Sequence, residues 1–142
     1  MVTFQSLLHG RVVIKYGTNA LTRVAKNGDV LGLNRQRIGY IAYFARVLYD
    51  IGIELVVVSS AAKTAGMEEK GVMNIATKDS QYYCAKGQLH LFKAYDKALK
   101  KQGLRLLAPL LVTHHDFKTE EHKRNIHKLV ERGFAEREIA VF

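Results

Sequence analysis

An unbroken run of strand-forming residues constrains the fold more than any other feature of this sequence. The run Ile53-Glu54-Leu55-Val56-Val57-Val58 is rich in β-branched residues and lacks the apolar–polar alternation of a strand with one face in water. Strands of this composition are typical of parallel sheets that are buried on both faces. The run therefore predicts a strand of a mostly parallel sheet.

The rest of the chain alternates between strand and helix patterns. This alternation predicts an α/β fold, a three-layer αβα sandwich with an open sheet, and 142 residues suit a single domain. The expected elements are strands at residues 11–15, 53–58, 104–113 and within 136–142, helices at 34–50, 79–102 and 119–132 with another beginning at 61–66, and loops at 26–29 and 68–78.

Four residues indicate how these elements begin, end or pack. Asn34 is a favourable helix N-cap, and Gly52 is placed to end the same helix. Gly87 interrupts the long helix, which indicates either close packing against another helix, the interpretation that we favour, or a close ligand. Pro109 removes a backbone donor, so its strand is predicted to lie at an edge or to contain a bulge.

Charge and composition argue against several classes of protein. The formal net charge is +9, but the basic residues are spread along the chain, and no RNA-binding aromatic signature or zinc-finger spacing is present, so we expect no nucleic-acid binding. No apolar run reaches the ~20 residues of a membrane helix, and the first ten residues do not resemble a secretory or transit peptide. We therefore expect a soluble intracellular protein that binds no membrane.

The cysteine and the histidines do not predict a disulfide or a metal site. Cys84 is the single cysteine, so no internal disulfide forms, and its place in an apolar stretch of a helix favours a buried, inert thiol. The tempting cluster His114-His115-Asp116 has neighbours that point apart and no fourth ligand at a useful spacing. We expect no histidine metal centre.

The segment after the first strand has the residue types of a phosphate-binding loop. Lys15 ends the strand, and Gly17 and Thr18 follow it. Ligands of open α/β sheets bind at the carboxyl ends of strands, where a lysine can neutralise phosphate oxygens and a glycine lets backbone N–H groups approach them. The motif is neither a Walker loop nor a dinucleotide fingerprint. A plain strand and turn with a solvated lysine remains an alternative.

The strand over residues 53–58 also ends in polar residues. Ser59 and Ser60 stand between this strand and a helix that begins near Ala61. Hydroxyl groups that face a helix N-terminus at a strand end form a favourable environment for an anion. Simple N-capping of the helix by either serine is the alternative.

Several segments, taken in order, carry a family pattern. They are Lys15-Tyr16-Gly17-Thr18-Asn19 after the first strand, Ser59-Ser60-Ala61 with Ala65-Gly66 after the second, Ala85-Lys86-Gly87-Gln88 in the long helix, and Leu111-Val112-Thr113 with Asp116-Phe117 and Lys123-Arg124-Asn125 beyond it. This set resembles the amino-acid kinase family, most nearly its glutamate 5-kinases and the kinase domain of pyrroline-carboxylate synthase. The resemblance extends from about residue 10 to residue 142.

The resemblance implies a function and roles for five residues. Lys15 would contact the phosphoryl groups of ATP and stabilise the transferring γ-phosphoryl, with Gly17 and Thr18 forming the loop over it. Ser60 and Ala61 would hold the substrate glutamate, whose γ-carboxylate is phosphorylated with Mg²⁺ as the first step towards proline. Residues 1–142 would form the N-terminal lobe, in the cytoplasm, or in the mitochondrion if the chain belongs to the eukaryotic bifunctional enzyme.

The sequence also departs from the family pattern. Ser80, Pro109 and Ala61 stand where the family often has lysine, glutamine and glycine. The family's Asn-Glu-Asn-Asp and Gly-Asp-Asn-Asp substrate segments, and its nucleotide-binding half, are absent from this sequence. We therefore expect an exposed apolar edge, with homo-oligomerisation or association with the C-terminal part. Two alternatives are a non-catalytic kinase-like binding or regulatory module and a relative with another substrate.

Overall fold

The computed structural model describes residues 10–72 and 79–142, and they form the predicted α/β fold. Four strands pair in the order β1-β4-β6-β5, and every pairing in this sheet is parallel. Two further strands, β2 and β3, form a small antiparallel hairpin. The strands are β1 (Arg11–Tyr16), β2 (Thr22–Val24), β3 (Val30–Leu33), β4 (Glu54–Ser59), β5 (Arg105–Pro109) and β6 (Glu138–Val141).

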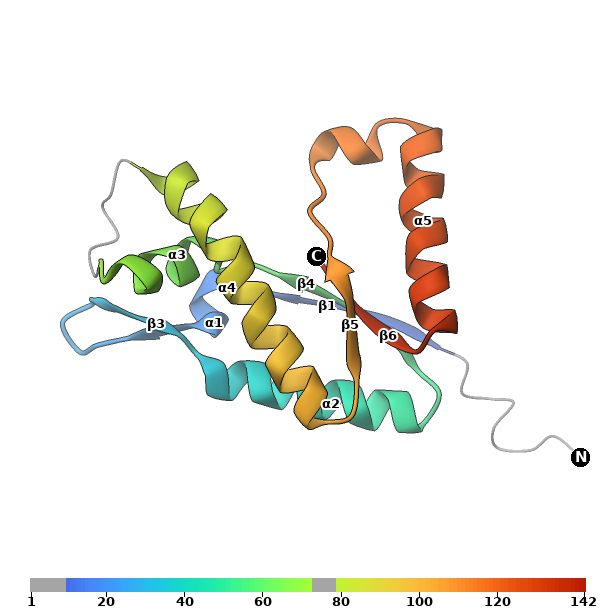
Figure 1. Ribbon diagram of the computed structural model, residues 1–142, viewed down its shortest axis with the longest axis horizontal. Coiled ribbons are helices and arrows are strands. Elements are labelled where there is room, and N and C mark those ends of the chain that lie inside the picture. Colours follow the sequence, from blue (N-terminus) through green and yellow to red (C-terminus); the bar gives the residue numbers. More distant parts are fainter. Residues whose placement is uncertain (1–9, 73–78) are drawn as a thin grey trace, which may run out of the picture.

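Helices cover both faces of the parallel sheet, as the sequence predicts (Figure 1). Leu55 and Val57 of β4 face the larger core, to which α2 and α4 contribute, whereas Val56 between them faces α5. The run of valines is therefore buried on both sides. The helices are α1 (Thr18–Leu21), α2 (Arg35–Asp50), α3 (Ala62–Lys70), α4 (Ser80–Lys101) and α5 (Glu120–Ala135), with a 3₁₀ turn η2 (His114–Phe117).

The predicted boundaries of α2 are confirmed. The side chain of Asn34 accepts a hydrogen bond of 3.0 Å from the backbone N–H of Arg37, which satisfies one donor of the first turn. Gly52 follows the helix with a φ of +79°, a left-handed conformation that ends helices and that glycine adopts without strain. The chain then enters β4 almost directly.

The loop predicted around residues 26–29 is the turn of a hairpin, and the prediction missed the two strands beside it. Thr22–Val24 and Val30–Leu33 pair on either side of the Asn27-Gly28 turn, where the Asn27 amide donates to the Asp29 carboxylate at 2.8 Å. Strands of three and four residues are too short for their alternation to be distinguished from a loop. The turn residues are therefore the clearer local signal.

The proline strand is shorter than predicted, and the strand at residues 138–141 is not an edge. β5 ends at Pro109, lies at the edge of the sheet and shifts register against β6 between Leu106 and Pro109, so both alternatives for the proline are realised. β6 pairs with β4 on one side and β5 on the other. The second edge is β1, where Val13 is 63% exposed.

Helices α3 and α4 pack closely because each carries a glycine at the contact. A Cβ on Gly87 would lie 1.7 Å from the carbonyl oxygen of Ala62, and a Cβ on Gly66 would lie 2.0 Å from that of Tyr83. The helix contact predicted for Gly87 is thus confirmed. The loop predicted over residues 68–78 is wrong at its start, because α3 continues to Lys70, and residues 73–78 lie outside the described residues.

Candidate functional site

Three strand ends meet at the carboxyl edge of the sheet and bring the predicted site residues together. The backbone N–H of Ser60 donates to the carbonyl of Tyr16 at 3.0 Å, and that of Ser59 donates to the carbonyl of Phe142, just after β6, at 2.7 Å. Lys15 lies opposite Val58 in the register of β1 and β4. Lys15 and Ser60, far apart in the sequence, therefore lie at neighbouring strand ends.

Lys15 projects from the open face of β1. Val12 and Ile14 pack against the larger core, so alternation along the strand places Lys15 on the opposite face, where it is exposed and has no polar partner among the described residues. Gly17 precedes α1, Thr18 begins it, and no side chain caps its first turn. An exposed lysine just before a turn whose N–H groups no side chain caps suits phosphate oxygens.

The two serines do not cap α3, so the capping interpretation is wrong. The N-cap position is Ala61, and no side-chain hydrogen bond caps the helix there. The hydroxyl of Ser59 donates to the carbonyl of Ser60 at 3.2 Å and lies 2.9 Å from the hydroxyl of Tyr95. The hydroxyl of Ser60 has no partner within the described chain and can bind a ligand.

Ala61 adopts a conformation that is unusual for a residue with a Cβ. Its φ is +81°, in the left-handed region, and its side chain is buried. This conformation costs an L-residue about 1–2 kcal/mol. Strained backbone of this kind is concentrated at functional sites, and here it turns the chain from β4 into α3 directly after the two serines.

A cavity of about 390 Å³ opens at the same edge of the sheet. Ser59, Gln88 and Thr113 contribute polar groups to a mainly apolar lining, which is typical of small-molecule sites. Lys15 and Ser60 do not line this cavity, but Ser59, which does, directly precedes Ser60 in the chain. Gln88 is a cavity residue that was not among the predicted site residues, although its position after the packing glycine Gly87 places it on the turn of α4 that contacts α3.

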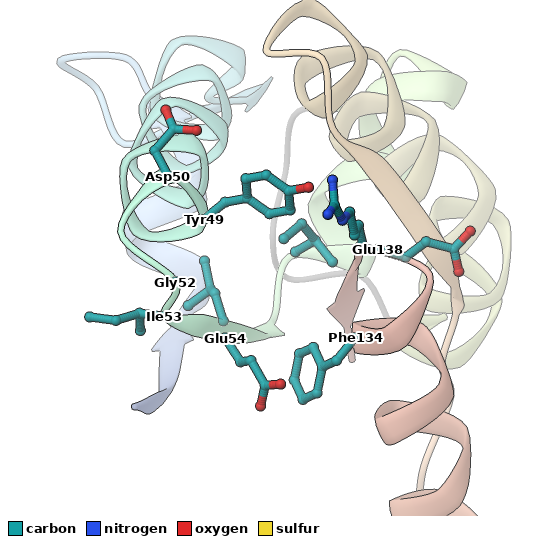
Figure 2. Close-up of a pocket in the computed structure, with 10 residues that line it drawn as sticks. Tyr49, Asp50, Gly52, Ile53, Glu54, Phe134 and Glu138 are labelled. Carbon is teal, nitrogen blue, oxygen red and sulfur yellow. The ribbon is translucent and has the colours of Figure 1, made fainter. Parts of the chain in front are cut away.

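A second hollow, of about 350 Å³, lies at the opposite, amino edge of the sheet (Figure 2). Figure 2 shows the ring of Tyr49, from the end of α2, reaching across it, with Phe134 and Glu54 on its lower side. Glu54 is already paired with Arg11 at 2.6 Å. Ligands of open parallel sheets bind at the carboxyl edge, and no predicted site residue lines this hollow, so we place the candidate site at the carboxyl edge.

Glu68 of α3 holds the β2–β3 hairpin beside the candidate site. Its carboxylate pairs with Arg35 at 2.6 Å and accepts a hydrogen bond from the Leu33 N–H at 3.2 Å. Burial acts to raise the pKa of Glu68, but the hydrogen bonds from Arg35 and Leu33 and the charges of Arg35 and Arg23 outweigh it, so the pKa lies below its ordinary value. The hairpin is therefore fixed to α3 by an ionised carboxylate.

The described ranges, 10–72 and 79–142, carry neither a metal-site cluster nor a membrane-spanning helix. No three or more histidine, cysteine, aspartate or glutamate side chains come together there as a metal site requires. None of the helices in these ranges combines the length and the apolar character needed to cross a bilayer. Cys84 is half-buried rather than buried, which corrects the expectation from its apolar sequence context.

The chain is similar to known proteins over most of its length. The model of the amino acid kinase family matches residues 10–136. The glutamate 5-kinase of Chlorobaculum tepidum is 30% identical over 130 residues, which cover 88% of this chain and 34% of that protein. The glutamate 5-kinases of Pseudomonas savastanoi pv. phaseolicola and Streptococcus sanguinis are each 33% identical over 129 residues, covering 87% of this chain and 33% of theirs. The chain spans about a third of the length of these relatives.

Proposed function

The chain belongs to the amino acid kinase family, and from this premise we propose that it forms the amino-acid-binding lobe of a kinase that phosphorylates the γ-carboxylate of glutamate. One observation carries the proposal. The Ser60 N–H donates to the Tyr16 carbonyl, so the exposed Lys15 and Ser60, whose side chains have no polar partner among the described residues, belong to neighbouring strand ends. The glutamate 5-kinases among the curated relatives support the choice of acceptor.

Each residue has a role that follows from its chemistry. Lys15, with the N–H groups after Gly17, stabilises negative charge on the phosphoryl group, while the Ser60 hydroxyl and the Ala61 N–H hold the acceptor carboxylate. ATP, when bound, supplies the phosphoryl group that a carboxylate oxygen of glutamate takes up, with ADP as the leaving group. This chemistry depends mainly on positioning and charge stabilisation, which the uncharged donors and the lysine provide.

The family implies Mg²⁺, but the residues that the structure describes do not provide a set of protein ligands for it. Magnesium takes oxygen ligands, usually one or two carboxylates together with substrate phosphates. No group of three or more histidine, cysteine, aspartate or glutamate side chains that could hold a metal lies within residues 10–72 and 79–142, and the polar side chains of the site, Lys15, Thr18 and the two serines, include no carboxylate. No residue of the described chain is therefore assigned to Mg²⁺.

Isothermal titration of the chain with glutamate and, separately, with Mg·ATP tests the proposal. We expect Lys15→Ala to weaken nucleotide binding roughly 10- to 100-fold, the effect of losing a charged hydrogen bond, and to leave glutamate binding unchanged. We expect Ser60→Ala to weaken glutamate binding roughly 3- to 10-fold. Lys101→Ala, an exposed lysine at the end of α4, is the matched control.

Two results would count against the proposal. If the folded chain binds neither ligand, it acts as a non-catalytic kinase-like module instead. If Lys101→Ala weakens nucleotide binding as much as Lys15→Ala, the binding reflects the overall charge of +9 rather than a site at the strand end.

A further inference from the structure

Tyr95 of α4 places a hydroxyl group inside the core, directly against the candidate site. Its side chain is 1% exposed and packs among the residues of the larger core. The hydroxyl oxygen lies 2.9 Å from Oγ of Ser59. A buried hydroxyl is costly without a hydrogen bond, so the burial of Tyr95 also fixes the position of the Ser59 side chain.

The direction of this hydrogen bond follows from the second contact of Ser59. The Ser59 hydroxyl donates to the carbonyl of Ser60 at 3.2 Å. Because a hydroxyl carries one proton, Ser59 accepts from Tyr95, and Tyr95 is the donor. Burial, partly opposed by the hydrogen bond to Ser59, raises the pKa of Tyr95 to about 12. The phenol therefore keeps its proton and remains a donor at physiological pH.

These two hydrogen bonds orient the peptide group between Ser60 and Ala61. A trans peptide is planar, and its C=O and N–H point in opposite directions. With the Ser60 carbonyl held towards Ser59, the N–H of Ala61 points away from Ser59, and it has no partner among the residues that the structure describes. Among the residues that the structure describes, the peptide thus presents an unpaired N–H next to the unpaired hydroxyl of Ser60.

On the basis of the function proposed above, we infer that Tyr95 is a positioning residue for the acceptor site. Its hydroxyl acts through Ser59 and holds the Ser60–Ala61 peptide so that the Ala61 N–H faces the acceptor carboxylate. Tyr95 lies in the core and does not itself touch the ligand. In the sequence, Tyr95 lies four residues from both Leu91 and Leu99, a spacing that indicates only the apolar stripe of a helix, so its polar role is visible only in the fold.

The first test compares Tyr95→Phe with Tyr49→Phe by titration with glutamate. Tyr49→Phe is the matched control because its hydroxyl makes no hydrogen bond within the described residues and lies at the opposite edge of the sheet (Figure 2). We expect Tyr95→Phe to weaken glutamate binding roughly 3- to 10-fold and to leave Mg·ATP binding unchanged. Ser59→Ala should weaken it similarly, and Ser59→Thr, which keeps the hydroxyl, should restore it.

The second test needs no ligand, so it separates this inference from the proposed function. In ¹H–¹⁵N spectra, Tyr95→Phe should shift the Ala61 amide resonance much more than Tyr49→Phe does. Equal shifts for the two variants, or unchanged glutamate affinity in Tyr95→Phe, would overturn the positioning role. A wild-type chain that binds no glutamate but shows the selective Ala61 shift would refute the proposed function and uphold the relay through Ser59.

Discussion

Replacing Gly87 by alanine is expected to destabilise the fold, although alanine is the better helix former. The added Cβ would lie 1.7 Å from the Ala62 carbonyl oxygen and 2.4 Å from the Gly66 nitrogen, and both are backbone atoms of α3. Contacts of a Cβ atom essentially never fall under 3.0 Å, so α3 would have to move away from α4 by at least about 1.3 Å. Overpacking of this kind costs about 1–3 kcal/mol or more, against a gain of about 1 kcal/mol in helix propensity.

Gly39→Ala provides the matched control for this prediction. Gly39 also lies inside a long helix, α2, but a Cβ there would meet nothing within 4 Å. Urea denaturation followed by circular dichroism should show a lower free energy of unfolding for Gly87→Ala, by about 1–3 kcal/mol, and a higher one for Gly39→Ala, by up to about 1 kcal/mol. If Gly87→Ala were as stable as wild type, the close packing of α3 on α4 would be refuted.

Two further predictions concern the hairpin and the sheet edge. Because the folded-state pKa of Glu68 is depressed, its contribution to stability is present above the unfolded pKa of about 4.3 and is lost as pH falls through the folded value. In thermal melts at pH 3–7, the melting temperature of Glu68→Gln should therefore fall less towards acid pH than that of the wild type. An unchanged dependence of melting temperature on pH would contradict this. Val13, 63% exposed on the edge strand β1, should promote self-association that Val13→Lys reduces in light scattering. Val24→Lys on the hairpin is the control, and a monomeric wild type would contradict the prediction.

The sequence predicts the elements of this fold better than their arrangement. The valine run, the cap at Asn34 and the proline at residue 109 act through local backbone chemistry, and each is confirmed. The insertion of β6 between β4 and β5 depends on long-range pairing that no local pattern contains. Lys15 and Ser60 could be selected because strand ends bind ligands, and their roles stay predictions. Tyr95 could not be selected, because a helical stripe does not show which buried residue is also a donor.

The contacts around Ser59 show how the candidate site depends on the global fold. On the β6 side, the Ser59 N–H donates to the Phe142 carbonyl, and the Phe142 N–H donates to the Val57 carbonyl at 2.8 Å. On the β1 side, the Ser60 N–H donates to the Tyr16 carbonyl. The two neighbouring strand ends therefore hold the backbone of Ser59 and Ser60 from both sides. Gly87→Ala should therefore weaken ligand binding mainly by lowering the folded fraction. Its free energy of unfolding in urea and its ligand affinity should then fall together. Tyr95→Phe removes one hydrogen bond inside an intact core, so it should lower the affinity of a chain that remains folded. Comparing the two variants distinguishes loss of the fold from loss of site geometry.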